Sequence, residues 1–171
     1  MFSFRPAATL ALALTLMTAA TAAAQDTASV TAPKEARNTF FVELLGNAGI
    51  YSLNYERFFT PQLGIRVGGM YFETVDEGDR ISVALFPVMG TWLLGQGNSH
   101  FEVGAGVGFG TAGIETTDIG DAWGSTVYGT ATLGYRYQKP GGGVMFRAGF
   151  TPVVAQGGVF PWVGASVGYA F

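Results

Sequence analysis

The last thirteen residues of the chain, 159–171, alternate between apolar side chains and small or polar ones. One set is Val163, Ala165, Val167, Tyr169 and Phe171, and the other is Trp162, Gly164, Ser166, Gly168 and Ala170. A period of two residues is that of a β-strand, in which successive side chains point to opposite faces. A strand with one apolar face and one small or polar face fits between lipid and a narrow barrel interior. The segment therefore predicts a transmembrane β-strand that ends at Phe171.

The same alternation divides the chain from Thr39 onward into eight extended segments separated by turn residues. These segments are 39–45, 49–59, 63–74, 81–94, 100–111, 126–138, 144–154 and 159–171. Eight is the smallest strand number in the usual series of bacterial membrane barrels. The predicted fold class is all-β: an eight-stranded antiparallel up-and-down transmembrane β-barrel over residues 39–171. Bulges are expected at Gly68-Gly69 and at Pro87, where the alternation becomes irregular.

The connections between these segments differ in length at the two ends of the predicted barrel. At the end that holds both termini they are short: 60–62, 95–99 and 139–143. At the opposite end, 75–80 and 112–125 are longer, whereas the connections 46–48 and 155–158 are brief. Long outer loops and short periplasmic turns are typical of outer-membrane barrels. Two of the four outer connections follow that rule.

The N-terminal region predicts a targeting segment followed by a tail. Residues 1–24 carry one early cation, Arg5, then an Ala- and Leu-rich apolar stretch, and they end in Ala22-Ala23-Ala24. This order is that of a cleaved secretory signal peptide. The alternative is an uncleaved anchor helix, because the apolar stretch is about the minimum length that spans a membrane. Residues 25–38 are polar, contain Pro33, and predict a flexible periplasmic tail.

Composition excludes several classes of protein. The chain has no cysteine, so neither a disulfide framework nor a lipidated cysteine is available. Charged residues make up 12% of the chain, against a usual value of about 25%. Beyond residue 24, no apolar run approaches the length of a transmembrane helix. A formal net charge of −3 gives no basic footprint for nucleic acid.

Charged residues also fall on the predicted inward faces of the strands. They are Glu43, Glu56, Arg66, Glu102, Arg136 and Arg147. Side chains about fill the interior of an eight-stranded barrel, so these three acids and three bases are expected to lie close together. Buried charges are tolerated when they are paired and hydrogen-bonded. The set predicts a structural network that plugs the lumen, and the alternative is a gate in a narrow proton or ion path. Alternate glycines in 104–110 are expected to make room for large neighbours such as Tyr128.

The predicted outer loops are acidic. Their acids are Asp76, Glu77, Asp79, Glu115, Asp118 and Asp121, with Arg80 as the one base among them. A solvated acidic surface is the simplest interpretation; the alternatives are divalent cations that bridge lipopolysaccharide, and a basic partner. Residues 117–121 lack the acidic series and the final Glu of a Ca²⁺ loop, so no metal site is predicted.

Enzymatic chemistry finds little support in the sequence. The single histidine, His100, follows Ser99 in a predicted periplasmic turn, and adjacent Ser and His residues do not make a catalytic arrangement by themselves. The glycines of 104–110 lie in a predicted strand and not in a strand-to-helix turn, so they do not form a phosphate loop. We expect neither catalytic residues nor a cofactor.

The segments 52–59 and 168–171 carry a resemblance to small outer-membrane β-barrel proteins of the OmpA and OmpX type. The resemblance implies that the assembly machinery of outer-membrane barrels recognises Tyr169 and Phe171. It also implies a location in the bacterial outer membrane, with membrane lipid and lipopolysaccharide as partners. Family members include stabilisers, adhesins, small pores and lipid-modifying enzymes, so fold does not give function. The function predicted is a non-enzymatic structural or surface-interaction role. The alternatives are a narrow channel, a lipid-modifying enzyme and a soluble lipocalin-like binder.

Overall fold

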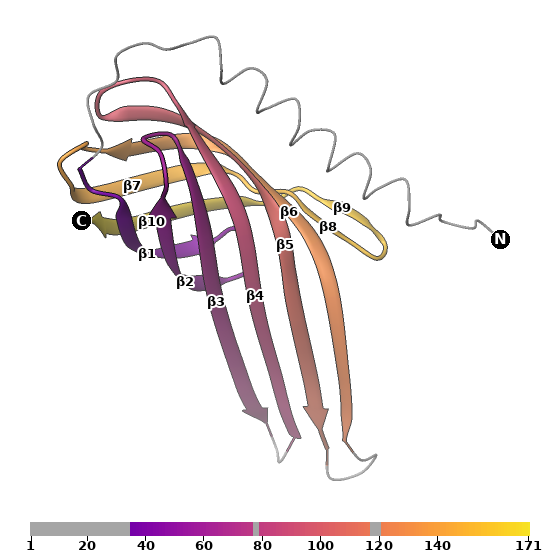
Figure 1. Cartoon of the computed structure of the whole chain (residues 1–171). Coiled ribbons are helices and arrows are strands. Elements are labelled where there is room, and N and C mark those ends of the chain that lie inside the picture. The colour runs from indigo at the N-terminus through magenta and orange to yellow at the C-terminus, as the bar shows by residue number, and fades with distance from the viewer. Residues whose placement is uncertain (1–34, 77–78, 117–120) are drawn as a thin grey trace. The chain divides into compact units, whose positions relative to one another are not determined.

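The computed structural model describes residues 35–76, 79–116 and 121–171, and the predicted signal peptide lies outside them. All ten elements in these ranges are β-strands (Figure 1). They are β1 Asn38–Leu45, β2 Tyr51–Phe58, β3 Leu63–Asp76, β4 Asp79–Leu94, β5 Ser99–Glu115, β6 Ala122–Gln138, β7 Gly143–Phe150, β8 Val153–Ala155, β9 Gly158–Phe160 and β10 Val163–Ala170. No helix in the described part of the chain is long and apolar enough to cross a membrane.

Antiparallel pairing joins the strands into a closed ring. Consecutive strands pair from β1 to β7, β10 pairs with β7 and with β1, and the pairing of β5 with β6 completes the circuit. The β8–β9 hairpin continues the β7–β10 pair, and β8 also pairs with β6. The predicted eight-stranded antiparallel barrel is confirmed, because β7 with β8 and β9 with β10 correspond to the seventh and eighth segments of the sequence.

Two prolines interrupt these last two segments, which the alternation predicts as continuous. Thr151-Pro152 separates β7 from β8, and Pro161-Trp162 separates β9 from β10. Proline lacks the backbone donor of a ladder hydrogen bond, so regular pairing stops at each of them. Trp162 lies on the predicted inward face of its strand, but it is 40% exposed and lines a surface groove together with Val163. The inward assignment of Trp162 is therefore wrong.

The facing of the strands follows the predicted alternation. On β2, Leu53 is 59% exposed, whereas its neighbour Asn54 is 1% exposed. The same contrast separates exposed Phe146 from buried Arg147 on β7. Polar and charged side chains fill most of the interior beside a few apolar ones such as Phe41, Phe58 and Met145, and large apolar side chains cover the outside. A soluble lipocalin-like binder requires the opposite facing, so the structure contradicts that alternative.

The bulges expected at Gly68-Gly69 and Pro87 are absent. Val67 pairs with Val88 and Met70 pairs with Leu85, so the register between β3 and β4 does not slip across the interruption. Gly68 contributes to this, since a Cβ added there would lie 2.3 Å from Asn54 Oδ1 and 3.3 Å from the Pro87 ring. A residue without a side chain leaves room for that ring, and neither strand needs an extra residue.

Two of the predicted outer loops are largely strand. Pairing between β3 and β4 reaches Asp76 and Asp79, and pairing between β5 and β6 reaches Ile114 and Ala122. Strands β3 to β6 therefore continue past the ends of β1, β2, β7 and β10 as a four-stranded sheet, which we call the extension (Figure 1). Local Gly, Asp and Thr content predicts loops here, but the ladder between neighbouring strands satisfies backbone hydrogen bonds that a loop would leave to water.

Candidate functional site: the lumen network and its plug

The barrel wall brings the six predicted inward charges into one buried cluster. They come from six strands, β1, β2, β3, β5, β6 and β7. Each of the six residues is at most 4% exposed. The formal charges of three carboxylates and three guanidiniums cancel, so their mutual attraction can offset the cost of removing each of them from water.

Five of these residues form one chain of salt bridges with Glu102 at its centre. The Glu102 Oε2 atom lies 3.2 Å from Nη1 of Arg136, and its Oε1 atom lies 2.9 Å from Nη1 of Arg147. Arg136 also pairs with Glu56, and Arg147 also pairs with Glu43. Acids and bases therefore alternate along the chain, and every guanidinium in it contacts two carboxylates.

Neighbouring polar and aromatic side chains hold the two arginines of this chain in place. Arg136 donates from Nε to Gln138 Oε1 at 2.9 Å and from Nη2 to Thr39 Oγ1 at 3.4 Å. Its guanidinium carbon lies 5.2 Å from the centre of the Phe58 ring, and that of Arg147 lies 5.0 Å from the Phe41 ring. A cation over an aromatic face is attracted by the ring quadrupole. These contacts restrict both arginines to one conformation.

Arg66 differs from the other two arginines. Among the described residues it forms no salt bridge, and its Nε and Nη1 atoms have no hydrogen-bond partner in the protein. Its Nη2 atom donates to Asn47 Oδ1 at 2.5 Å, and it also contacts Met89 and Thr132. Arg66 thus offsets the negative charge of the network without contacting a carboxylate directly. Its hydrogen bond is to Asn47, in the connection between β1 and β2.

That connection, residues 46–50, folds into the mouth of the barrel at the end opposite the C-terminus and plugs it. Asn47 is 1% exposed, and its Nδ2 donates to Thr130 Oγ1 at 2.6 Å and to the Ala131 carbonyl at 2.9 Å. Tyr128 donates from its hydroxyl to the Asn47 carbonyl at 3.0 Å. Gly46 makes the inward turn possible, because its φ of +92° favours glycine and a Cβ there would lie 2.4 Å from the Glu43 carboxyl carbon.

Sequence reasoning missed the Asn47 plug. The segment 46–48 was expected to be only a brief outer loop, and the spacing of its residues gives no sign that the loop turns inward. The one available signal is that an asparagine and an alanine lie between two glycines, Gly46 and Gly49, both of which have positive φ. The expected fit of Tyr128 against Gly108 is present, because a Cβ at Gly108 would lie 2.0 Å from the tyrosine ring.

We expect Asn47→Ala to loosen the plug. The substitution removes the amide nitrogen that donates to Thr130 and Ala131, and it also removes the oxygen that accepts a hydrogen bond from Arg66. We expect the unfolding free energy to fall by about 1–3 kcal/mol, because buried polar groups are left without partners. Urea unfolding of the refolded chain in phosphatidylcholine vesicles measures the change. Asn98→Ala, in the exposed β4–β5 turn, is the control and should stay within about 0.5 kcal/mol of the parent. Equal stability of the two variants would show that the plug is not held by its side chain.

The acids of the predicted outer loops do not form one cluster. Asp76 pairs with Asp79 across the β3–β4 hairpin, and Glu115 lies 3.8 Å from Arg80, which also lies 3.7 Å from Glu73. Asp121 is exposed, whereas Glu77 and Asp118 lie outside the described residues. Within the described ranges, no group of three or more His, Asp or Glu side chains is arranged to hold a metal ion.

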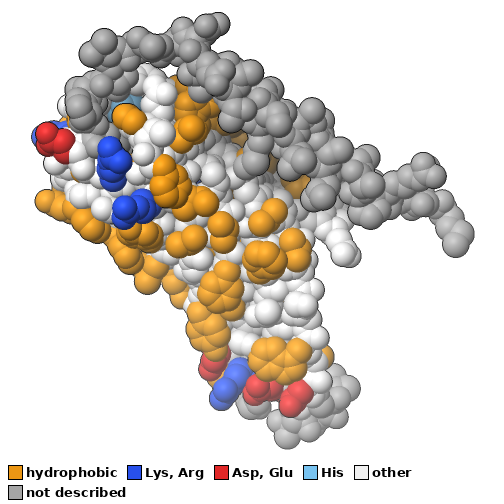
Figure 2. Space-filling view, in the orientation of Figure 1, with side chains coloured by type: hydrophobic (Ala, Val, Ile, Leu, Met, Phe, Trp, Pro, Cys, Tyr) orange, Lys and Arg blue, Asp and Glu red, His pale blue; other side chains and the backbone are white. Residues whose placement is uncertain are grey.

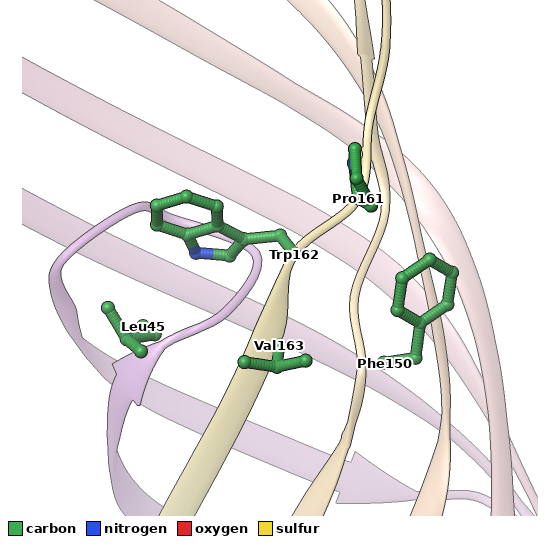
Figure 3. Close-up of a pocket in the computed structure, with 5 residues that line it drawn as sticks. All are labelled: Leu45, Phe150, Pro161, Trp162 and Val163. Carbon is green, nitrogen blue, oxygen red and sulfur yellow. The ribbon is translucent and has the colours of Figure 1, made fainter.

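A shallow groove of about 200 Å³ lies at the outer end of the short strands (Figure 3). Leu45, Phe150, Pro161, Trp162 and Val163 line it. None of these side chains carries a carboxylate, an imidazole or a hydroxyl group. The groove offers an apolar surface and provides no acid, base or nucleophile.

The predicted assembly signal lies on the outer surface of the barrel, at the end that holds the chain terminus. Tyr169 and Phe171 are 58% and 56% exposed. The backbone amide of Phe171 donates to the Asn38 carbonyl at 2.8 Å, and the Asn38 amide donates to the Phe171 carbonyl at the same distance. The start of β1 and the end of the chain therefore meet where the barrel closes.

Comparison with known proteins supports this architecture at the level of fold. The N-terminal β-barrel domain of Pseudomonas aeruginosa OprF is 16% identical, with a TM-score of 0.59, over 80% of this chain and 99% of that domain. Ail of Yersinia pestis, solved in complex with the heparin analogue sucrose octasulfate, is 12% identical, with a TM-score of 0.53, over 79% of this chain and 95% of Ail. No family model and no curated protein sequence matches the chain.

The chain thus has the closed eight-stranded fold of small outer-membrane β-barrels, which the resemblance in its sequence predicts. At these identities the likeness establishes the fold alone, so any role must be argued from the lumen and the surfaces of this chain.

Proposed function

We propose that the chain is a non-enzymatic barrel of the bacterial outer membrane, with a closed lumen and a structural or surface-interaction role. The observation that carries the proposal is the lumen, where a neutral Arg/Glu network and the Asn47 plug occupy the space that a channel would need. In this proposal the end with both termini faces the periplasm, and Tyr169 and Phe171 serve the assembly machinery. The extension then stands outside the cell, near lipopolysaccharide.

The outer surface supports a membrane location. On β5 the outward side chains from Phe101 to Phe109 are apolar, and most of them are exposed. The eight steps of about 3.4 Å between these nine residues give a band about 27 Å long, which a strand tilt of about 40° reduces to about 21 Å in height. This is close to the apolar band of about 25 Å in membrane barrels. Figure 2 shows hydrophobic side chains over the visible wall of the barrel and charged ones at the far end of the extension.

Cell fractionation with gel mobility of heated and unheated samples tests the membrane location. We expect an outer-membrane protein with a heat-modifiable band, because a closed barrel resists detergent until it is boiled. A periplasmic protein without a mobility shift would contradict the proposal.

Planar bilayer recordings of the purified chain test the closed lumen. We expect no current steps, because Glu102, Arg136 and Arg147 occupy the lumen in mutual contact. Steps that disappear in Glu102→Ala or Arg136→Ala would favour the narrow channel instead.

The mass of lipid A from cells that express the chain tests for a lipid-modifying enzyme. We expect that mass to be unchanged.

A further inference from the structure

The face of the extension that continues the lumen changes character relative to the barrel below it. In the barrel, the face toward the axis is polar and the outside is apolar. Beyond Met70 and Leu85, the face continuous with the lumen is apolar. It carries Met70, Phe72, Ile81, Val83, Leu85 and Ile114, which we call the inner face of the extension.

The opposite, outer face of the extension is mixed, because it carries charged residues beside exposed apolar ones such as Val75 and Trp123. Arg80 lies between Glu73 and Glu115, at 3.7 Å and 3.8 Å. Trp123 covers Gly113, where a Cβ would lie 2.5 Å from the indole ring. The charges of Glu73, Arg80 and Glu115 on this face already have partners. A sheet that only connected strands in water would have no reason to carry apolar residues on its other face.

The apolar residues of the inner face lie in adjacent rows across β3, β4 and β5. Phe72 pairs with Val83, which pairs with Ala112, and one row farther out Ile81 pairs with Ile114. The base of the face is covered, since a Cβ at Gly49 would lie 3.5 Å from Leu85. Farther out, Phe72, Ile81 and Ile114 are 40%, 43% and 47% exposed. Large neighbouring apolar side chains left in water mark a surface that a partner covers.

Charge selects the kind of partner. Asp76 and Asp79 lie opposite each other on the inner face at the end of the β3–β4 hairpin, and both are exposed. Among the described residues of this face there is no Lys or Arg, and the nearby Arg80 lies on the outer face. A partner that covers the face therefore needs an apolar stripe and cations beside it. A second copy would bring its own Asp76 and Asp79 against the same acids.

We propose that the inner face of the extension binds a cationic amphipathic helix of a partner protein or peptide. The inference rests on the proposed orientation, which exposes the extension outside the cell. Three neighbouring strands spaced about 4.8 Å apart span about 10 Å, which matches the width of a helix. The helix lays its apolar stripe on Phe72, Ile81 and Ile114 and places Lys or Arg near Asp76 and Asp79. Binding an amphipathic helix by its apolar side is an established mode of recognition.

The test uses the full chain refolded into phosphatidylcholine nanodiscs, with empty nanodiscs as the blank. The probe is a fluorescein-labelled amphipathic Leu/Lys helix of about 18 residues, a length of about 27 Å. Two comparison peptides are a Leu/Glu helix with the same apolar stripe and a Leu/Lys peptide with scrambled order. We expect saturable binding of the Leu/Lys helix, and binding at least about tenfold weaker for the other two.

Matched variants locate the binding surface. Phe72→Ser with Ile81→Ser should weaken binding at least about tenfold, and Asp76→Asn with Asp79→Asn should weaken it several-fold and reduce its dependence on salt. The control, Val75→Ser with Trp123→Ser, changes exposed apolar residues of the outer face and should leave binding within about twofold.

Three results would overturn the inference. They are no saturable binding, equal binding of the Leu/Glu helix, and an inner-face variant that alters self-association but not peptide binding. The heat-modifiable band of the same nanodisc sample separates the two proposals. A chain that does not insert refutes the proposed function together with the inference, whereas an inserted chain that fails to bind refutes the inference alone.

Discussion

Glu102→Gln should lower the unfolding free energy of the barrel by about 3–5 kcal/mol. Glu102 is the carboxylate that Arg136 and Arg147 share, at 3.2 Å and 2.9 Å. Glutamine retains the shape of the side chain but not its charge, so both guanidiniums lose a buried partner and the network becomes net positive. Removing one member of a buried ion pair costs far more than the net value of the pair, because the remaining charge cannot return to water. Urea unfolding in phosphatidylcholine vesicles measures the loss.

Glu115→Gln is the matched control for this prediction. Glu115 is on the same strand and also contacts an arginine, at 3.8 Å, but its side chain is 43% exposed. A solvent-screened pair contributes about 0–1 kcal/mol, so this variant should remain close to the parent. A double-mutant cycle of Glu102→Gln with Arg147→Met should show a coupling of roughly 0.5–3 kcal/mol. Similar losses for the two single glutamine variants would show that burial of the network contributes nothing.

Gly134→Val should abolish the folded, heat-modifiable form, with a loss greater than about 3 kcal/mol. Gly134 pairs with Gly149 at the contact of β6 with β7. A Cβ at Gly134 would lie 2.4 Å from the Ala148 carbonyl oxygen and 2.6 Å from Gly149 Cα. Both are backbone atoms that no rotamer change can move, so a side chain there forces the two strands apart. The barrel cannot close around Arg136 and Arg147 in that arrangement.

The control is Gly124→Val, on the same strand β6 but in the extension, where an added Cβ meets no atom within 4 Å. Valine favours strands, and the variant should remain within about 0.5 kcal/mol of the parent. Gel mobility before and after heating reports on both variants. A folded Gly134→Val band would mean that β6 and β7 separate there at little cost.

Much of the barrel can be predicted from the sequence because side-chain facing is a local property. Leu53 and Asn54, or Phe146 and Arg147, must point to opposite sides of a strand whatever the strand pairs with. The number of strands, the apolar exterior and the charged interior follow from that alternation. The boundaries of the extension could not be predicted in the same way, since Arg80 and Glu115, which lie far apart in the chain, hold each other in neighbouring strands.

Within the lumen, the sequence by itself determined that acids and bases would meet, and only the tertiary structure decided which of them meet. Glu102 contacts two arginines, whereas Arg66 contacts Asn47 and forms no salt bridge within the described residues. Pairing depends on the register with which the ring closes, and on the loop at Gly46 turning inward. Both depend on contacts between residues far apart in sequence, such as Asn47 with Thr130, which no local period encodes.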